Sequence, residues 1–315
     1  MKVCFYGLGS IGKRHLSNLA ELCRRKELPL EVHAIRKKQA PLPDELRPLI
    51  QKEFFNTLPQ GEFYDAVFIT NPTALHFEAI QETRHISRCF FVEKPVFQNE
   101  HTDLTSLMLP KENRYYVAAP LRYTGVLQYL YRFCNDNPVY SARVISSSYL
   151  PDWRPGVDYR TVYSAKKALG GGVAIDLIHE WDYLTYLFGF PKEVLMLSGK
   201  VSHLEIDSED LAVYLGRYQD KFVEVHLDYF GREAVRQVQL FAKNMTVTGD
   251  FLNGCVTFGG QREPLRFSET PNDKYLREME HFLDLMEHPT LSSDNSLEHA
   301  LATLQIASGS HRTIH

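Results

Sequence analysis

Three glycines with the spacing Gly7-x-Gly9-x-x-Gly12 are the strongest chemical signal in the chain. They follow a short apolar run and open a segment with helical periodicity. The first glycine permits a tight turn, the second lets the backbone approach a pyrophosphate, and the third lets the helix pack closely on a strand. A helix that begins here offers free N–H groups and a partial positive charge. The motif predicts a dinucleotide site, to which Ser10 and Ile11 contribute through the first helical turn.

The second predicted strand, Glu31–Ile35, ends without the carboxylate that usually holds the adenosine ribose 2′-hydroxyl. Arg36, Lys37 and Lys38 stand there instead. An arginine at this place can form charge-assisted, bidentate bonds with a 2′-phosphate. We therefore expect NADP to be preferred over NAD, with Arg36 as the deciding residue. The alternative is that Arg36 is a solvated charge or stacks on adenine, and that NAD is still accepted.

A lysine stands at the end of another predicted strand, Cys89–Val92, in the sequence Glu93-Lys94-Pro95. Open α/β sheets bind their ligands at the carboxyl ends of the strands. Lys94, followed by a proline that restricts the backbone, is placed there to face a nicotinamide. The alternative for Lys94 is a surface salt bridge.

Four polar residues, Asp176, His179, Glu180 and Tyr183, recur with helical spacing after three consecutive glycines. At about 100° per residue they share one helix face, and the opposite face is apolar. An apolar back would anchor the helix while the polar face looks into a cleft. A lone histidine on a helix is usually structural, but one grouped with Asp, Glu and Tyr is a candidate for proton transfer.

The segment 149–160 is loop-like and combines prolines and a glycine with aromatic and charged residues. Aromatic faces beside Arg and Asp suit a carbohydrate, or an anionic group on one. The alternative is a packed structural loop. The residues that we assign to substrate binding are Arg122, Trp153, Arg154, Tyr159, Arg160, Tyr163 and Glu180.

Two patterns of elements must position these residues. Up to about residue 121, short apolar runs alternate with helical segments, which predicts a doubly wound parallel α/β sheet. Its strands are expected at 3–7, 31–35, 65–70, 89–92 and 115–119, with helices after the glycine turn and through residue 85. From 122 to 315 strands follow one another without intervening helices, which indicates an α+β domain with an antiparallel sheet. Here we expect strands at 140–149, 211–218, 222–229, 237–242 and 245–248, a hairpin tip at Asp220, and helices at about 171–188, 273–286 and 296–308.

Composition excludes several classes of protein. The 315 residues are 44% hydrophobic, which suits one or two globular domains, and the net charge of -4 gives no reason to expect a nucleic-acid partner. Five scattered cysteines without metal-ligand spacing favour reduced thiols and no metal site. We find no apolar run of about 18 residues and no basic segment with a cleavage site at the N-terminus. These features predict a cytoplasmic protein.

With these motifs, the chain resembles the Gfo/Idh/MocA oxidoreductases, a family that includes glucose–fructose oxidoreductase and inositol dehydrogenase. The resemblance rests on four motifs in order: GLGSIGKRH (Gly7–His15), TNPTALH (Thr70–His76), EKP (Glu93–Pro95) and GGGVAIDLIHEWD (Gly170–Asp182). It implies an N-terminal Rossmann domain and a C-terminal domain on a large open, mainly antiparallel sheet. The loop around 149–160 is similar to that of members in bacterial surface-sugar pathways, which suggests an amino-sugar, sialic-acid-like or nucleotide-linked sugar.

The resemblance also implies roles for individual residues. Lys94 would be a catalytic lysine that touches nicotinamide and substrate, and Asn71, Pro72 and His76 would lie along the cofactor with Glu93. Asp176 and His179 match the family's Asp/His pair, although the usual pattern has one more residue between them. We expect His179 to act as general acid/base, oriented by Asp176, while Lys94 polarises the substrate oxygen. The exchange of roles between Lys94 and His179 stays open.

Two other functions remain as alternatives: a non-catalytic, nucleotide-sensing regulator of the same fold, or a reductase of a non-sugar compound such as a tetrapyrrole or a cyclic dihydrodiol. The regulator would tend to lose the lysine or the histidine, and both are present here. An open sheet needs its second face covered, so a homodimer or homotetramer is expected.

Overall fold

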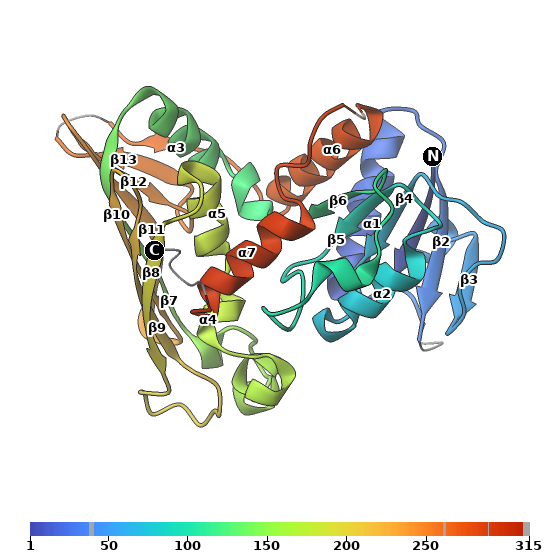
Figure 1. Ribbon diagram of the computed structural model, residues 1–315, viewed down its shortest axis with the longest axis horizontal. Helices are drawn as coiled ribbons and strands as arrows, with labels where there is room; N and C mark the ends of the chain where they lie inside the picture. Colours follow the sequence, from blue (N-terminus) through green and yellow to red (C-terminus); the bar gives the residue numbers. More distant parts are fainter. Residues whose placement is uncertain (38–40, 261–262, 289, 311–315) are drawn as a thin grey trace. The chain divides into compact units, whose positions relative to one another are not determined.

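The computed structural model describes residues 1–37, 41–260, 263–288 and 290–310 (Figure 1). Lys38, the last of the predicted basic cluster, lies outside these residues. The chain divides into two compact units. The first comprises Met1–Pro120 and Asn272–Leu301, and the second comprises Leu121–Pro271 and the residues from Ala302 on. The predicted boundary between 121 and 122 differs from this division by one residue, and the return of 272–301 to the first unit was not predicted.

The first unit is built on a six-stranded parallel sheet with the order β3-β2-β1-β4-β5-β6. The inner strands are buried along almost their whole length, which is why the sequence shows them as continuous apolar runs. The predicted doubly wound sheet is confirmed, but the edge strand β3 was missed because it has only four residues and begins with two charged ones. The strands are β1 (Lys2–Tyr6), β2 (Glu31–Arg36), β3 (Lys52–Phe55), β4 (Ala66–Ile69), β5 (Cys89–Val92) and β6 (Arg114–Val117).

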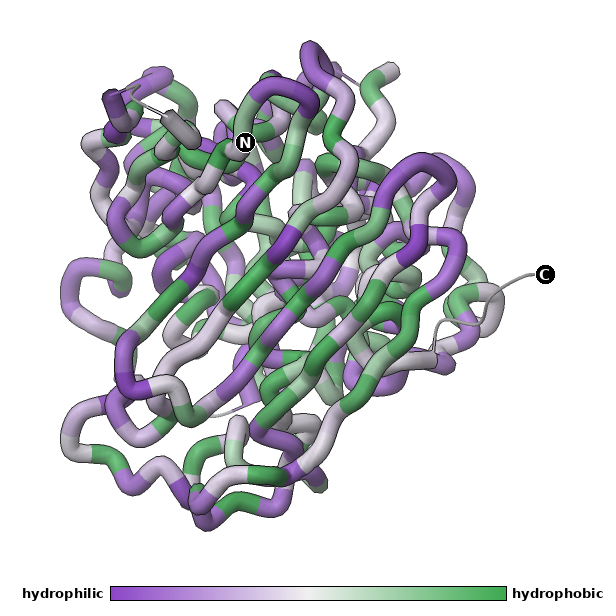
Figure 2. Tube along the Cα trace, turned by 90° about the vertical axis from the view of Figure 1, so that its left-hand side faces the viewer, coloured by the Kyte–Doolittle hydropathy of each residue, from purple (hydrophilic) through white to green (hydrophobic). Residues whose placement is uncertain are grey.

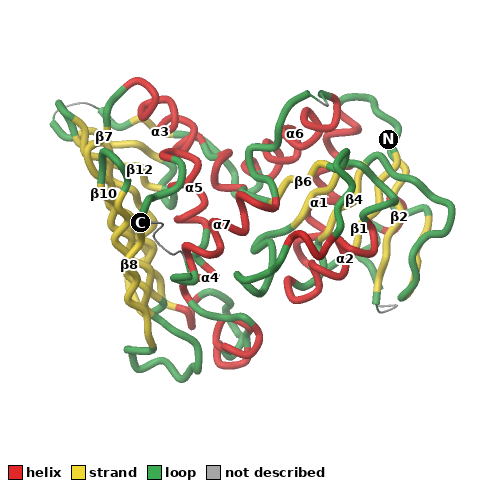
Figure 3. Tube along the Cα trace, viewed as in Figure 1, coloured by secondary structure: helices red, strands yellow, loops and turns green. Residues whose placement is uncertain are grey.

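Helices α1 (Ser10–Arg25), α2 (His76–Thr83) and α6 (Asp273–Glu287) pack around this sheet (Figure 3). The ring of Phe282 in α6 lies 5.5 Å from that of Phe68 and 5.3 Å from that of Phe91, both in central strands. The amides of Asn18 and Asn272 also exchange hydrogen bonds of 3.3 and 2.8 Å. These contacts explain why the chain comes back to its first unit after residue 271.

The second unit is built on an eight-stranded sheet with the order β14-β13-β12-β11-β7-β10-β9-β8. All neighbouring strands are antiparallel except β7 and β10, which pair in parallel. The mainly antiparallel sheet is confirmed, while β8, β13 and β14 were not predicted. The strands are β7 (Val139–Tyr149), β8 (Glu193–Gly199), β9 (Leu211–Arg217), β10 (Phe222–Asp228), β11 (Phe230–Ala242), β12 (Thr246–Asp250), β13 (Cys255–Phe258) and β14 (Leu265–Arg266).

Helices lie against one face of this large sheet (Figure 1). They are α3 (Gly125–Asp136), which the sequence did not predict, α4 (Val173–Asp176), α5 (His179–Phe188) and the end of α7 (Leu297–Ala307). Two glycines in the sheet permit close packing. A Cβ atom at Gly249 would lie 2.7 Å from Leu130 in α3, and one at Gly216 would lie 3.2 Å from Trp181 in α5.

Hydrophobic and hydrophilic residues follow one another along the strands of this sheet (Figure 2), and some large apolar side chains are exposed. Leu197 is 80% exposed there, and its register partner in β9 is Val213. The other large apolar side chains exposed on β8, β9 and β10 are Leu195, Leu215 and Phe222. This unit therefore presents an apolar surface that the described part of the chain does not cover.

Candidate active site

The glycine turn has the geometry that its spacing predicts. Gly7 takes a positive φ of 98° directly after β1, and its N–H donates to the carbonyl of Ile35 at 2.9 Å. A Cβ atom at Gly7 would lie 2.8 Å from the Cα atom of Asn71, at the end of β4. A Cβ atom at Gly12 would lie 2.6 Å both from the Gly7 carbonyl and from Oγ1 of Thr70. These two positions therefore require glycine for backbone conformation or packing.

Gly9 differs from the other two glycines, because a Cβ atom there would meet no atom within 4 Å. It is the N-cap of α1, and no side chain caps this helix end. The first turn also contains no acidic residue. The N–H groups at the start of α1 thus face open space and favour an anion. This cradle fits the pyrophosphate of a dinucleotide.

Asn71 and His76 connect the loops that follow β4 and β5. The Asn71 amide donates to the Leu75 carbonyl at 3.2 Å, and nothing in the described part of the chain donates to its buried Oδ1 atom. An unpartnered buried acceptor usually has a functional reason, and this one suits an amide of a bound ligand. His76 is fully buried, with Nε2 3.0 Å from the Asn71 carbonyl and Nδ1 3.1 Å from the Val96 carbonyl. Burial lowers the pKa of His76.

The placement of His76 does not support direct contact with a cofactor. It instead holds the backbone of Asn71 in position. Pro72, next to Asn71, is exposed at this edge of the sheet.

Lys94 follows β5 and is partly exposed, with a cis peptide bond to Pro95. Its backbone N–H donates to the carboxylate of Glu93 at 3.1 Å, and the other oxygen of that carboxylate pairs with Nε2 of His15. Burial would raise the pKa of Glu93, but the His15 hydrogen bond and the charges of His15 and Lys94 hold it below its ordinary value. Glu93 was predicted to touch the cofactor. In the structure it is buried and connects α1 to the backbone of Lys94.

Arg36 lies at the end of β2, as predicted, but it is not a free charge. Its guanidinium forms an ion pair with Glu53 and lies 5.9 Å from the ring of Phe55. Both partners come from β3, the strand that the sequence analysis missed. This strand has only four residues and begins with two charged side chains, so it lacks the apolar pattern that would have predicted it.

In the second unit, Asp176 is the centre of a hydrogen-bonded cluster. Tyr229 donates to its Oδ2 atom at 2.6 Å, and Tyr163 donates to Oδ1. Burial raises the pKa of both tyrosines, so their hydroxyls keep their protons and donate to the carboxylate. Tyr163 was a predicted substrate residue, whereas Tyr229 was missed, because it follows β10 far from Asp176 in sequence.

The expectation of one continuous helix over about 171–188 is wrong. The segment forms two helices, α4 and α5, which are interrupted at Leu177 and Ile178. Gly172 precedes α4 with a φ of 140°, and a Cβ atom there would collide with the carboxylate of Glu209. Asp176 ends α4 and His179 begins α5. The break therefore falls between Asp176 and His179, whose spacing is one residue shorter than in the family that the sequence resembles.

The expectation of a polar helix face that looks into a cleft is also wrong in part. Glu180 and Tyr183 are fully buried. Glu180 accepts a hydrogen bond of 2.7 Å from Arg236 in β11 and forms an ion pair with it. This pairing gives Glu180 a structural role, and it does not support the predicted contact with substrate.

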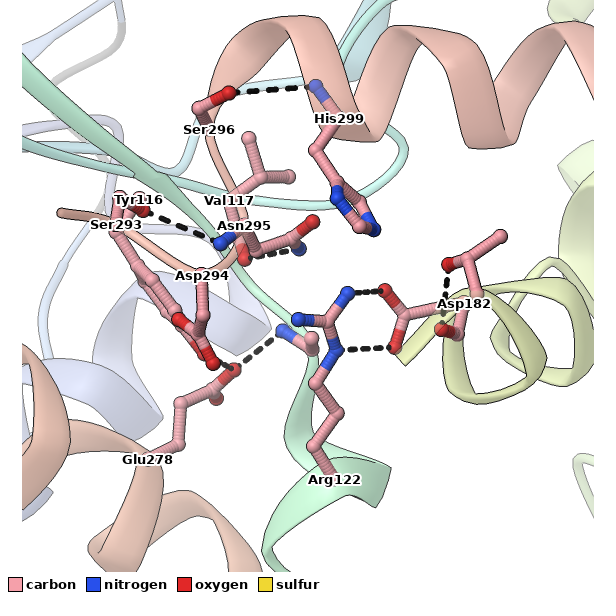
Figure 4. Close-up of polar contacts among 12 residues, drawn as sticks. Tyr116, Val117, Arg122, Asp182, Glu278, Ser293, Asp294, Asn295, Ser296 and His299 are labelled. Atoms are coloured by element: carbon pink, nitrogen blue, oxygen red, sulfur yellow. Dashed lines mark hydrogen bonds and ion pairs between the residues drawn. The ribbon is translucent and has the colours of Figure 1, made fainter. Parts of the chain in front are cut away.

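Arg122 is likewise buried in an ion pair and does not support its predicted contact with substrate (Figure 4). Its Nε and Nη2 atoms donate to the two oxygens of Asp182 at 3.1 and 2.7 Å. Its guanidinium also lies 5.0 Å from the ring of Tyr186. The arginine thus joins the start of the second unit to α5.

Three of the predicted substrate residues, Trp153, Arg154 and Tyr159, line one small surface pocket. The ring of Trp153 packs edge-on against Tyr229, with 5.3 Å between the ring centroids. Because Tyr229 donates to Asp176, this contact places the pocket next to the Asp176 cluster. Arg160 is exposed and pairs with Asp158 and Glu205. The remaining pocket residues are Leu150, Pro151, Val157, Val162 and Ser164.

Within the described residues, no group of His, Cys, Asp and Glu side chains is arranged to hold a metal ion. No helix in those same residues has the length and apolar character needed to cross a membrane.

No protein-family model matches the chain. The structure resembles levoglucosan dehydrogenase in complex with NADH and levoglucosan, with a TM-score of 0.80 and 14% identity over 98% of this chain and 95% of that chain. It also resembles the WlbA dehydrogenase of Bordetella pertussis in complex with NADH and UDP-GlcNAcA, with a TM-score of 0.74 and 17% identity over 98% and 94%. The fold is that of these dehydrogenases. This finding confirms the predicted fold class.

One curated relative is an uncharacterized oxidoreductase, YrbE of Bacillus subtilis (strain 168). It is 25% identical over 190 residues, which cover 58% of this chain and 52% of the relative. The match thus spans about half the length of that protein.

Proposed function

We propose that the chain is a nicotinamide-dependent oxidoreductase of the Gfo/Idh/MocA family, which transfers a hydride between nicotinamide and a hydroxyl or keto carbon of a sugar or sugar derivative. The glycine turn carries this proposal. It follows β1, while Asn71 follows the neighbouring strand β4, and the strand order reverses between these two strands. Open α/β sheets bind dinucleotides at such a switch point. Lys94, at the end of the next strand, adds a proton-carrying group at the same edge of the sheet.

The residues of the first unit support binding of such a cofactor in three ways. The uncapped N-terminus of α1 is suited to hold the pyrophosphate, and the free Oδ1 atom of Asn71 is suited to accept a hydrogen bond from an amide. His76 and Glu93 fix the backbone around Asn71 and Lys94. The bound nicotinamide would supply the hydride acceptor or donor.

Proton transfer must accompany the movement of the hydride, because the substrate hydroxyl loses or gains its proton. We assign His179 as general acid/base and Lys94 as the group that polarises the substrate oxygen, and the reverse assignment remains open. Asp176 is the positioning carboxylate. The hydroxyls of Tyr163 and Tyr229 donate to its two oxygens and fix the orientation of the carboxylate.

The substrate class follows from the pocket beside this cluster. An exposed indole and an arginine, Trp153 and Arg154, suit a sugar that carries an anionic group. The complexes of the two similar dehydrogenases with levoglucosan and with UDP-GlcNAcA support a sugar-type substrate. We propose an amino-sugar, a sialic-acid-like sugar or a nucleotide-linked sugar of a bacterial surface pathway.

For the cofactor, we propose NADP or NAD with Arg36 as the residue that recognises a 2′-phosphate. Arg36 alone predicts a preference for NADP. For the assembly, we propose a homodimer or homotetramer that covers the apolar residues of β8, β9 and β10. We propose the cytoplasm as its location.

The decisive experiment combines binding with turnover. Isothermal titration calorimetry with NADH and NADPH tests the cofactor site, and a thermal-shift panel of sugars and nucleotide sugars identifies ligands by the stabilisation that they give. With a substrate from the panel, Lys94→Ala should lower kcat by about 10²- to 10⁴-fold and leave nucleotide affinity almost unchanged. A chain that binds the nucleotide, but turns over no sugar and behaves identically as Lys94→Ala, would instead be a nucleotide-sensing regulator.

A further inference from the structure

The end of β2 and the end of β3 form one small charged cluster in the first unit. In their parallel register, Ala34 lies opposite Glu53, and Arg36 lies opposite Phe55. Residues two apart in a strand point to the same face, so the arginine, the carboxylate and the phenyl ring share one side of the sheet. The Arg36 side chain is only 10% exposed, whereas Glu53 is 33% exposed.

Hydrogen bonds also connect the backbone at the end of β2 to the residue that follows β3. Asn56, the residue after β3, donates its N–H to the Arg36 carbonyl at 3.1 Å and its side-chain amide to the Lys37 carbonyl at 3.3 Å. Asn56 takes a positive φ of 55°, a conformation that asparagine tolerates better than most residues. The guanidinium of Arg36 therefore pairs with the Glu53 carboxylate and lies 5.9 Å from the Phe55 ring, while Asn56 holds the backbone of Arg36.

We propose that Glu53 sets how strongly the chain discriminates between NAD(H) and NADP(H), a role that rests on the proposed function. The carboxylate that normally stands at the end of β2 is absent from that strand, but Glu53 of β3 brings a carboxylate to the guanidinium of Arg36. There it neutralises Arg36 and uses part of its hydrogen-bonding capacity. A 2′-phosphate must compete with Glu53 for the guanidinium and is repelled by the same carboxylate.

Glu53 should therefore affect the binding affinities of the two cofactors differently. A ribose 2′-hydroxyl can donate to the carboxylate, as it does to the usual residue at the end of β2. The result is a weaker preference for NADP(H) than Arg36 alone predicts. Because the Glu53 side chain is 33% exposed, water can solvate its carboxylate when the pair opens, so Glu53 tunes the selectivity and does not abolish binding of either cofactor.

The test measures binding and does not require a substrate. Calorimetric titrations with NADH and NADPH are made on the wild-type chain and on Glu53→Gln, which keeps the shape of the side chain but removes its charge. We expect the Kd for NADPH to fall about tenfold and that for NADH to change less than about threefold. The same contrast should appear with adenosine 2′,5′-bisphosphate against 5′-AMP, which report only on the adenosine end.

Glu45→Gln is the matched control, because it changes the net charge equally at an exposed position outside the cluster. Arg36→Gln should weaken NADPH binding, and in that background Glu53→Gln should have a smaller effect than in the wild type. If both nucleotides bind the wild-type chain, but Glu53→Gln leaves the ratio of their Kd values within twofold, the inference is wrong. If neither nucleotide binds the wild-type chain, the proposed function fails and the inference fails with it.

Discussion

Tyr229 donates a hydrogen bond of 2.6 Å to Oδ2 of Asp176, from a position that is fully buried. Tyr163 donates to the other oxygen of the same carboxylate but is 43% exposed. The two tyrosines thus serve one carboxylate from different environments. We therefore expect the hydroxyl of Tyr229 to contribute more to the free energy of unfolding than that of Tyr163.

Replacement of Tyr229 by Phe should destabilise the chain by about 1–3 kcal/mol, because a buried acceptor loses its donor and water cannot replace it. Tyr163→Phe should cost less than Tyr229→Phe, because Tyr163 is 43% exposed and its surroundings are more open to water. Urea unfolding at pH 7 compares the two variants. Equal losses of free energy would mean that the environments of the two hydroxyls do not differ as the structure indicates.

The glycines of the phosphate turn provide a second contrast. Gly12→Ala should destabilise the first unit by about 1–3 kcal/mol, because the new Cβ atom would lie 2.6 Å from the Gly7 carbonyl and from Thr70. Gly9→Ala meets no atom within 4 Å and should change stability by less than about 0.5 kcal/mol. It should nevertheless weaken nucleotide binding, because its methyl group enters the space before α1. Calorimetry and urea unfolding on both variants test this pair, and undiminished NADH and NADPH affinity in Gly9→Ala would remove the turn from the cofactor site.

The Glu93–His15 pair should make stability depend on pH. The pKa of Glu93 lies below its ordinary value in the folded state, because the stabilising contacts of His15 and Lys94 outweigh the effect of burial. Ionised Glu93 therefore stabilises the fold above about pH 4.3, and this contribution is lost as the pH falls through the ordinary pKa toward the lowered one.

Glu93→Gln should accordingly be less stable than the wild type by about 2–4 kcal/mol at pH 7, with a difference that shrinks below about pH 4.3. Unfolding curves at several pH values between 7 and 3.5 measure this difference. A constant gap over the whole range would show that the charge of Glu93 plays no part.

Replacement of two arginines of the second unit by Met should have opposite effects on stability and on ligand binding. Arg122→Met should cost about 3–5 kcal/mol of stability, because it leaves the carboxylate of Asp182 buried without its partner. Arg154→Met, at an exposed position that lines the pocket, should change stability by less than about 0.5 kcal/mol and weaken binding of an anionic sugar. Thermal unfolding and ligand titration distinguish the two roles. A stable Arg122→Met chain with impaired sugar binding would restore the original assignment of Arg122 to the substrate.

The apolar face of the large sheet predicts self-association. Leu197→Glu combined with Leu215→Glu should convert the proposed oligomer into a monomer, because charges on a buried interface are costly to desolvate. Light scattering at micromolar concentration measures the change. Met108→Glu, an equally exposed apolar position in the first unit, is the control and should leave the assembly intact. A wild-type chain that is already monomeric would contradict the prediction.

The sequence by itself determined the elements whose signals are local. Continuous apolar runs indicated the buried parallel strands, and the glycine spacing indicated the turn and the start of α1, because backbone conformation and close packing at Gly7 and Gly12 leave no other residue type. The strands after residue 200 follow one another without intervening helices, and this pattern indicated the antiparallel sheet. The strands β3 and β14 gave no such signal, because β3 has four residues and begins with two charged ones and β14 has only two residues. The strand β8 was missed although Val194–Leu197 is a continuous apolar run.

The tertiary structure decided which polar groups meet. Glu53 reaches Arg36 only because β3 pairs with β2, and Tyr229 reaches Asp176 only because the end of β10 comes beside α4. Glu180 and Arg122 have residue types suited to a binding site, but burial gave each of them an ion-pair partner that no local pattern indicates. Charge and hydrogen-bonding capacity are properties of a residue, whereas the partner that uses them is a property of the fold.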